Sequence, residues 1–269
     1  MKKLNLGVKE KFNQNKKSKE NIRKSCNFGS KKIGCIIQAR TGSSRFPNKV
    51  LMKIKNKSIL EHIISFLKFS KNIDEIIIAT SDLPQDDIIE QIAIENNVSV
   101  FRGSENDVLS RYYFCAKKFN VDIIVRITAD NPLIDPMLVD KIISGFQFDD
   151  FDYISNMISQ TFPLGYLVEA FTFQILEKLH YSLNDLESRE HVTPYLRKNP
   201  KKFKTKNIVA PKGLKRNQWR LTLDYNEDLK LLKIIFDNIY NSGNYIPYES
   251  VVKFLDSNKS FLKINQNLE

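Results

Sequence analysis

Three positively charged side chains lie in one short polar segment that follows an apolar run. Arg40, Arg45 and Lys49 belong to Gln38–Lys49, which comes directly after Ile33–Ile37. The same segment holds small and hydroxyl-bearing residues, namely Ala39, Gly42, Ser43 and Ser44. Cations together with accessible backbone N–H groups are suited to holding a polyphosphate. We therefore predict that this segment binds a polyphosphate, with a solvated basic loop as the alternative.

Two aspartates are candidates for binding a magnesium ion. Asp130 follows the apolar run Val121–Ile127, and Asp224 follows Arg220–Leu223. Mg²⁺ is usually bound by one or two carboxylates plus phosphate oxygens, so we expect both aspartates to hold Mg²⁺ beside the polyphosphate. Asp135, which directly precedes a proline, is the better cap for the next helix. A helix N-cap is the alternative for Asp224.

The elements that must position these residues alternate in type. Apolar runs typical of buried strands are Ile33–Ile37, Glu75–Thr80, Val98–Phe101 and Val121–Ile127. Helical patterns between and after them are 59–67, Asp86–Asn96, Glu105–Phe119 and Pro136–Phe146. This alternation predicts an α/β fold with a doubly wound, mostly parallel sheet and helices on both faces. Ligands bind beyond the carboxyl ends of such strands, which selects the loops 38–49, 80–87, 102–107 and 128–135.

The pattern changes after about residue 150. Residues 162–173 mix Pro, Gly and aromatic residues, which favours an antiparallel excursion in the C-terminal half. Further strands are predicted at 153–156, 203–209 and 219–223, and further helices at 185–197, 225–240 and 249–255.

The charge of the chain is concentrated at its N-terminus. The protein has 269 residues and a formal net charge of +11. Residues 1–32 hold 11 of the 42 Lys and Arg but 2 of the 31 Asp and Glu, which leaves 31 against 29 for the remainder. We predict a basic disordered tail over 1–31 and one domain over 32–269. The nearly neutral remainder makes nucleic acid an improbable partner.

Other classes of protein are excluded by composition. No stretch approaches the roughly 18 consecutive apolar residues needed for a membrane span. Three cysteines without metal-ligand spacing argue against a disulfide framework or a zinc site. A reducing cytoplasm is therefore the expected location.

Several of these segments together resemble the CMP-sugar cytidylyltransferases, a group that includes the acylneuraminate and 3-deoxy-manno-octulosonate enzymes. The spore-coat-polysaccharide branch is the most similar. The resemblance is carried by Ile37–Leu51, Ala79–Asp82, Phe101–Tyr112, Arg126–Pro136, Phe162–Gly165 with Glu169, Arg189–Tyr195 and Leu223–Leu229. It covers about residues 33–235. Gln38 departs from the acylneuraminate and octulosonate enzymes, which usually have proline there.

The resemblance implies a single-domain Rossmann-like nucleotidyltransferase that activates a sugar with CTP and releases pyrophosphate. It implies that Arg40, Arg45 and Lys49 hold the triphosphate, that Asp130 acts in catalysis, and that Asp130 and Asp224 hold Mg²⁺. The base would face Thr80, Ser81, Ser104 and Asp107. Polar residues that could contact the acceptor are Arg126, Glu169, Arg189 and His191.

The resemblance also implies a homodimer, with about residues 150–215 forming an acceptor and dimerisation section. Aromatic side chains there could supply the interface or belong to the core.

Two other enzyme classes use similar chemistry. A nucleotidyltransferase acting on a sugar phosphate with another nucleoside triphosphate would need the same cations and carboxylates. A GT-A glycosyltransferase would need an Asp-x-Asp triplet just after a strand, whereas Asp150 and Asp152 precede theirs. A non-enzymatic alternative is an RNA-binding protein that uses its basic tail.

Overall fold

A computed structural model describes residues 28–147 and 150–268. Of the predicted basic tail, only residues 28–31 belong to this described part. No helix in the described part of the chain has both the length and the apolar character needed to cross a membrane.

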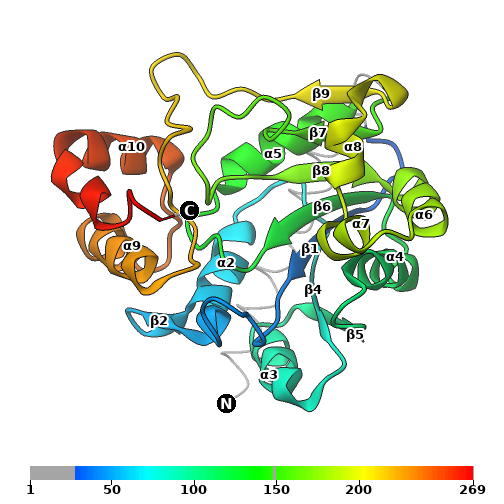
Figure 1. Ribbon diagram of the computed structural model, residues 1–269, viewed down its shortest axis with the longest axis horizontal. Helices are drawn as coiled ribbons and strands as arrows, with labels where there is room; N and C mark the ends of the chain where they lie inside the picture. Colours follow the sequence, from blue (N-terminus) through cyan, green and yellow to red (C-terminus); the bar gives the residue numbers. More distant parts are fainter. Residues whose placement is uncertain (1–27, 148–149, 269) are drawn as a thin grey trace, which may run out of the picture.

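A seven-stranded sheet forms the centre of the molecule, in the order β5-β4-β1-β6-β8-β7-β9 (Figure 1). The strands are β1 (Ile33–Gln38), β4 (Glu75–Ser81), β5 (Ser99–Gly103), β6 (Ile123–Thr128), β7 (Tyr153–Ser155), β8 (Glu169–Thr172) and β9 (Thr205–Asn207). Neighbours among β5, β4, β1 and β6 run parallel, whereas β8 is antiparallel to both β6 and β7. A small hairpin of β2 (Lys53–Ile54) and β3 (Lys57–Ser58) lies apart from this sheet.

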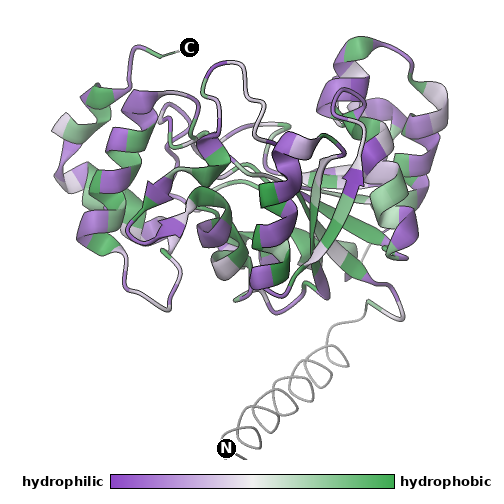
Figure 2. Ribbon diagram, turned by 90° about the horizontal axis from the view of Figure 1, so that it is seen from below, coloured by the Kyte–Doolittle hydropathy of each residue, from purple (hydrophilic) through white to green (hydrophobic). Residues whose placement is uncertain are grey.

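Helices cover both faces of the sheet. On one face lie α2 (Ile59–Leu67), α3 (Asp87–Glu95) and α5 (Pro136–Ser144). The same core continues into α9 (Asn226–Ile239), which packs on α2, and into α10 (Tyr248–Ser257), which packs on α9. The other face packs against α4 (Val108–Lys118), α6 (Phe173–Ser182) and α8 (Pro194–Lys198), with α7 (Leu186–His191) beside α4. Figure 2 shows largely hydrophobic strands between helices of mixed colour. The predicted doubly wound α/β architecture, including its antiparallel part, is confirmed.

The apolar runs form strands because both of their faces are buried. In β1, Ile33, Cys35 and Ile37 join the core on one side, and Ile36 joins the core on the other. A strand buried on both faces has no polar alternation, which is why these runs are continuous. Helix α5 begins at a polar cap, because the Asp135 carboxylate accepts the backbone N–H of Met137, as predicted.

The predictions for the C-terminal half are only partly correct. The predicted strand over Trp219–Leu223 is wrong, since the segment forms a single β-bridge between Leu164 and Arg220. The helix predicted over 185–197 is divided into α7 and α8 because Val192 adopts φ 69° and Pro194 follows it. Helix α6 lies between the predicted antiparallel section and α7; the sequence places His180 in a helical segment but does not define the bounds of this helix.

Candidate active site

Two adjoining pockets open at the carboxyl ends of the parallel strands. The larger has a volume of about 330 Å³ and the smaller about 210 Å³. Arg126, Thr128 and Asp130 line both, so the end of β6 and the residues just after it form the boundary between them. The structure thus provides two compartments that meet at one carboxylate.

The larger pocket contains most of the predicted phosphate-binding residues. Its lining includes Arg40, Ser43, Ser44, Arg45 and Lys49, from the loop after β1 and the first residue of the 3-10 helix η1 (Lys49–Leu51). His191 and Glu190 at the end of α7 line it as well. Ala39 is buried, and its backbone N–H donates to the Ala79 carbonyl of β4. A Cβ atom at Gly42 would lie 2.8 Å from the Glu105 Oε1, so the loop passes close to its neighbours.

Lys49 joins the two predicted metal carboxylates. Its ammonium lies 2.9 Å from Asp130 Oδ2 and 2.8 Å from Asp224 Oδ1. Arg45 also contacts Asp224 Oδ1, at 3.2 Å. The segment before Asp224 is held against the loop after β6, because the Leu223 N–H donates to the Asp130 carbonyl. The fold thus brings Lys49 into contact with Asp130, which is 81 positions away in the sequence, and with Asp224, which is 175 positions away.

This cluster of charges shifts the pKa values of its members. Burial alone would lower the pKa of Lys49, but the charges and hydrogen bonds of Asp130 and Asp224 raise it above its ordinary value. Burial alone would raise the pKa of Asp224, but the hydrogen bond from Lys49 and the nearby arginines lower it. Lys49 and Asp224 therefore stay charged at neutral pH.

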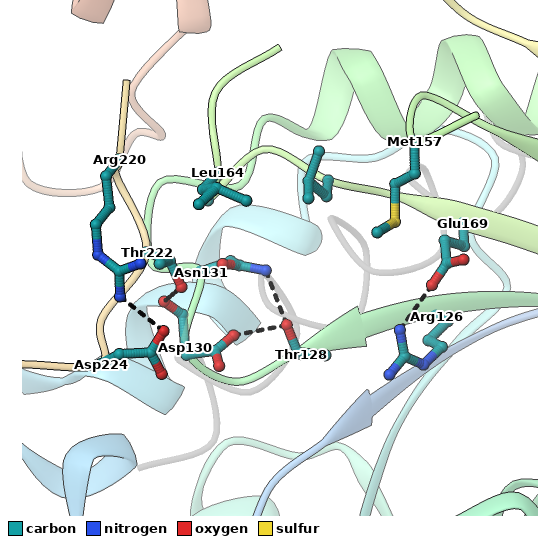
Figure 3. A pocket seen from close by; sticks show the side chains of 12 residues that line it. Arg126, Thr128, Asp130, Asn131, Met157, Leu164, Glu169, Arg220, Thr222 and Asp224 are labelled. Carbon is teal, nitrogen blue, oxygen red and sulfur yellow. Dashed lines mark hydrogen bonds and ion pairs between the residues drawn. The ribbon is translucent and has the colours of Figure 1, made fainter. Parts of the chain in front are cut away.

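The Asp130 carboxylate is oriented by its neighbours on the same loop. Thr128 Oγ1 donates to Asp130 Oδ1 at 2.6 Å, and Asn131 Nδ2 donates to Thr128 Oγ1 at 2.8 Å. The other oxygen of Asp130 is left to face Lys49. Figure 3 shows these side chains on one wall of the smaller pocket, near Asp224 and Arg220.

Arg126 and Glu169 form a charged wall at the opposite side of the smaller pocket (Figure 3). Their guanidinium and carboxylate groups lie 2.6 Å apart, and Glu169 is 1% exposed. Glu169 also accepts hydrogen bonds from Tyr153 and Arg197. Burial alone would raise the pKa of Glu169, but the two arginines lower it. The apolar part of this pocket comes from Met157, Leu164 and Leu167.

A buried carboxylate that the sequence analysis did not single out anchors the loop after β1. Asp86, in the 3-10 helix η2 (Pro84–Asp86), accepts hydrogen bonds from the Thr41 N–H at 2.8 Å and the Thr41 hydroxyl at 2.6 Å. Ser81 donates to its other oxygen at 2.5 Å. The Thr41 carbonyl in turn accepts the N–H groups of Ser43 and Asn48. Asp86 therefore connects the cation-bearing loop to the end of β4.

The residues predicted to face the base do not line the larger pocket. Thr80 and Ser81 are fully buried at the end of β4. The Ser104 hydroxyl accepts the backbone N–H of Asp107, and Asp107 caps α4 by accepting the N–H of Ser110. These hydrogen bonds of Ser104 and Asp107 lie within the loop after β5 and the start of α4.

The four candidate acceptor residues are separated in the structure. Arg126 and Glu169 line the smaller pocket, while His191 lines the larger one. Arg189 lines neither; it pairs with Asp107 and donates to the His180 and Leu183 carbonyls, which ties α7 to α4 and α6.

The geometry agrees with the argument against an Asp-x-Asp site. Asp152 directly precedes β7, which runs parallel to β6 because both are antiparallel to β8. The start of β7 therefore lies at the opposite edge of the sheet from the two pockets. The Asp152 carboxylate instead accepts the backbone N–H of Lys204 before β9.

The residues present fit a magnesium ion. Two carboxylates that converge on one ammonium can converge on one cation, and Mg²⁺ commonly takes one or two protein carboxylates and completes its shell with phosphate oxygens and water. Within the described residues, no group of three or more His, Cys, Asp or Glu side chains is arranged to hold a metal. Asp130 and Asp224 are the two carboxylates that meet at Lys49.

Comparison with known proteins relates the chain to cytidylyltransferases. A family model described as cytidylyltransferase matches residues 34–260, which include every residue lining the two pockets. An uncharacterized protein of Methanocaldococcus jannaschii is 42% identical over 240 residues, covering 88% of this chain and 96% of that protein. The spore coat polysaccharide biosynthesis protein SpsF of Bacillus subtilis is 35% identical over 209 residues, covering 75% and 85%. The solved structure of a cytidylyltransferase from Leptospira borgpetersenii serovar Hardjo-bovis matches with a TM-score of 0.83 and 36% identity, covering 89% of this chain and 98% of that one.

Proposed function

Because the chain belongs to the cytidylyltransferase family, whose model spans residues 34–260, we propose that it transfers CMP from CTP to an acidic sugar of a surface polysaccharide. The observation that carries this proposal is the convergence of Lys49, Asp130 and Asp224 where the two pockets meet. One pocket would take the nucleotide and the other the sugar. The relationship to a polysaccharide biosynthesis protein supports the sugar as acceptor.

The proposed reaction joins an acceptor oxygen to the α-phosphorus of CTP and breaks the bond to the β-phosphate oxygen, so pyrophosphate leaves. The acceptor hydroxyl gives its proton to solvent in this step, and the electron pair of the broken P–O bond leaves with the pyrophosphate. Arg40, Arg45 and Lys49 would stabilise the negative charge that develops on the departing pyrophosphate. The compartments on either side of Asp130 would bring the two reactants together, which lowers the entropic part of the barrier.

We include Mg²⁺ in the proposal, held by Asp130 and Asp224. When bound, such an ion orients a phosphate and polarises it toward attack. Thr128 and Asn131 would keep the Asp130 carboxylate directed at the site through their hydrogen bonds.

An acidic acceptor is proposed because the wall of the smaller pocket formed by Arg126 carries surplus positive charge. Arg126 is partly neutralised by Glu169, but Glu169 is shared with Arg197, so this trio carries one surplus positive charge. Arg220, on the other side of the pocket (Figure 3), is already paired with Asp224 and Asp228. The available positive charge therefore lies at Arg126. A sugar carboxylate is a suitable partner for a planar guanidinium.

The test is pyrophosphate release measured with each of the four nucleoside triphosphates, Mg²⁺, and a panel of ulosonic acids and sugar phosphates. We expect turnover with CTP and an ulosonic acid, and loss of turnover in Asp130→Asn. Turnover that requires a sugar phosphate and another triphosphate would replace this proposal with the alternative. No pyrophosphate release from CTP with any acceptor would refute it.

The family resemblance also leads us to propose a homodimer that works in the cytoplasm. Tyr153, Phe162 and Tyr166 are buried in the core of one chain, so an interface in the section 150–215 would draw on other residues. Light scattering measures the mass directly, and a monomer would refute the dimer.

The buried thiols of Cys35 and Cys115 are unpaired, as a reducing compartment allows.

A further inference from the structure

The C-terminal segment is hydrogen-bonded to residues beside the candidate active site by the buried side-chain amide of Asn265. After α10, the 3-10 helix η5 (Lys259–Ile264) leads to Asn265, which is 3% exposed. Figure 1 shows this C-terminal segment returning from α10 toward the centre of the molecule. Asn265 Nδ2 donates to Asp228 Oδ1 at 2.8 Å and to the Arg220 carbonyl at 2.9 Å. Both hydrogens of the amide are therefore used.

Asp228 is the centre of the network that Asn265 joins. Its carboxylate is fully buried, at the start of α9. It accepts the backbone N–H groups of Asp224 and Tyr225 at 2.9 and 3.0 Å, and it pairs with Arg220 Nε at 3.0 Å. A buried carboxylate is stable only when its oxygens are hydrogen-bonded and its charge is paired. Each donor therefore contributes to keeping Asp228 in this orientation.

Arg220 connects Asp228 to Asp224 in the candidate active site. Its Nε faces Asp228, and its Nη2 donates to Asp224 Oδ2 at 2.9 Å. The opposite oxygen of Asp224 contacts Lys49. Both oxygens of the Asp224 carboxylate are thus directed, one by Arg220 toward the C-terminal segment and one by Lys49 toward the junction of the pockets.

We propose that Asn265 and Asp228 are positioning residues, which hold Arg220 so that Arg220 holds the Asp224 carboxylate toward the junction of the two pockets. The C-terminal segment beyond residue 260, where the family match ends, is then part of the active-site machinery. This inference rests on the proposed function, because it assigns Asp224 a role in that reaction. Asn265 touches no substrate and acts only through the network.

An asparagine is required here by its chemistry and not only by its shape. An aspartate at this position would have nearly the same volume but no N–H donor, and its carboxylate would lie against the carboxylate of Asp228. A residue that only fills space would tolerate this change far better than a residue that donates two hydrogen bonds.

The test compares Asn265→Ala and Asn265→Asp with Asn258→Ala. Asn258 is a matched control, since its Nδ2 also donates to a carbonyl at 2.8 Å, that of Phe254, in the same C-terminal region but away from Asp228. We expect both Asn265 variants to lose about tenfold in kcat, as typically follows when the support of an active-site carboxylate is removed. The KM for CTP should change by a smaller factor than kcat, because Arg45 and Lys49 contact Asp224 but Asn265 itself contacts neither of them. Asn258→Ala should keep its kcat.

Two results would overturn the inference. One is a kcat for Asn265→Ala and Asn265→Asp within about twofold of that of Asn258→Ala at matched folded fraction. The other is a crystal structure of Asn265→Ala in which Asp224 keeps its contacts with both Lys49 and Arg220, where we expect at least one to be lost. The crystallographic result needs no assumption about the reaction. Absence of turnover in the wild-type chain would refute the proposed function and leave this structural comparison to decide the positioning role.

Discussion

Replacement of Lys49 by methionine should destabilise the protein and abolish most of its activity. Methionine has a similar length but no charge, so Asp130 and Asp224 lose the ammonium that lies 2.9 and 2.8 Å from them. Breaking a buried ion pair costs about 3–5 kcal/mol. Asp130 is 25% exposed, and Asp224 keeps Arg45 and Arg220. We therefore expect the lower end, about 3 kcal/mol, which corresponds to a fall of roughly 6–12 °C in Tm for a chain of this size.

Calorimetry at several pH values tests the cause as well as the size of this effect. The pKa of Asp224 is lowered in the folded state, so its contribution is present above its unfolded pKa of about 3.9 and is lost as the pH falls through the lower folded value. The difference between wild type and Lys49→Met should therefore shrink below about pH 4. Lys198→Met is the control, because its pair with Glu187 is exposed and should contribute less than about 1 kcal/mol. Equal stability of Lys49→Met and wild type at pH 7 would refute the reasoning.

The Lys49→Met variant should bind a divalent cation more tightly than the wild-type protein. The ammonium occupies the position between the two carboxylates that the proposed Mg²⁺ would use, and unit charges about 4 Å apart interact by about 4 kcal/mol at a protein surface. Solvent reduces this, so we expect a gain of at least about tenfold in Mn²⁺ affinity, measured by electron paramagnetic resonance without nucleotide. An unchanged or weaker affinity would show that Lys49 and the cation do not compete.

Three further predictions concern single positions. Asp130→Asn should lose about 10²–10³ in kcat while Tm changes little, as measured by pyrophosphate release and calorimetry. Glu169→Gln should lose about 3–5 kcal/mol in urea unfolding at pH 7, because Arg126 is left unpaired in the interior. The pKa of Glu169 is lowered in the folded state, so this loss should diminish as the pH falls below about 4; a loss as large at pH 3 as at pH 7 would contradict the assignment. Gly165→Ala should cost more than about 2 kcal/mol, since Gly165 has φ 102° and a Cβ would lie 2.3 Å from the Leu221 carbonyl oxygen; near wild-type stability would show that the backbone relaxes.

Much of the sheet and of the larger pocket was predictable from local patterns. A strand buried on both faces requires a continuous apolar run, so β1, β4 and β6 are visible in the sequence. Parallel strands place their carboxyl ends at one edge, which brings the loop 38–49 to the loop after β6. The predicted meeting of Lys49 with Asp130 follows from that topology.

Predictions failed where an element depends on distant partners. The segment 219–223 alternates as a strand does, yet its neighbour Leu164 supplies only one bridge, so no ladder forms. The ion pair between Arg189 and Asp107 was not predicted either, and the acceptor contact proposed for Arg189 stays a prediction. Neither outcome is encoded within a window of a few residues.

The sequence by itself therefore determined which runs are strands, which edge of the sheet carries the cations, and the family to which the chain belongs. Only the tertiary structure decided that Asp86 anchors the loop at Thr41, and that Asn265 and Asp228 support Asp224 through Arg220. The physical reason is that the burial of a strand or helix is reflected in the pattern of apolar residues within that one element. A hydrogen bond across 37 or 45 positions depends on the path of every segment between its partners.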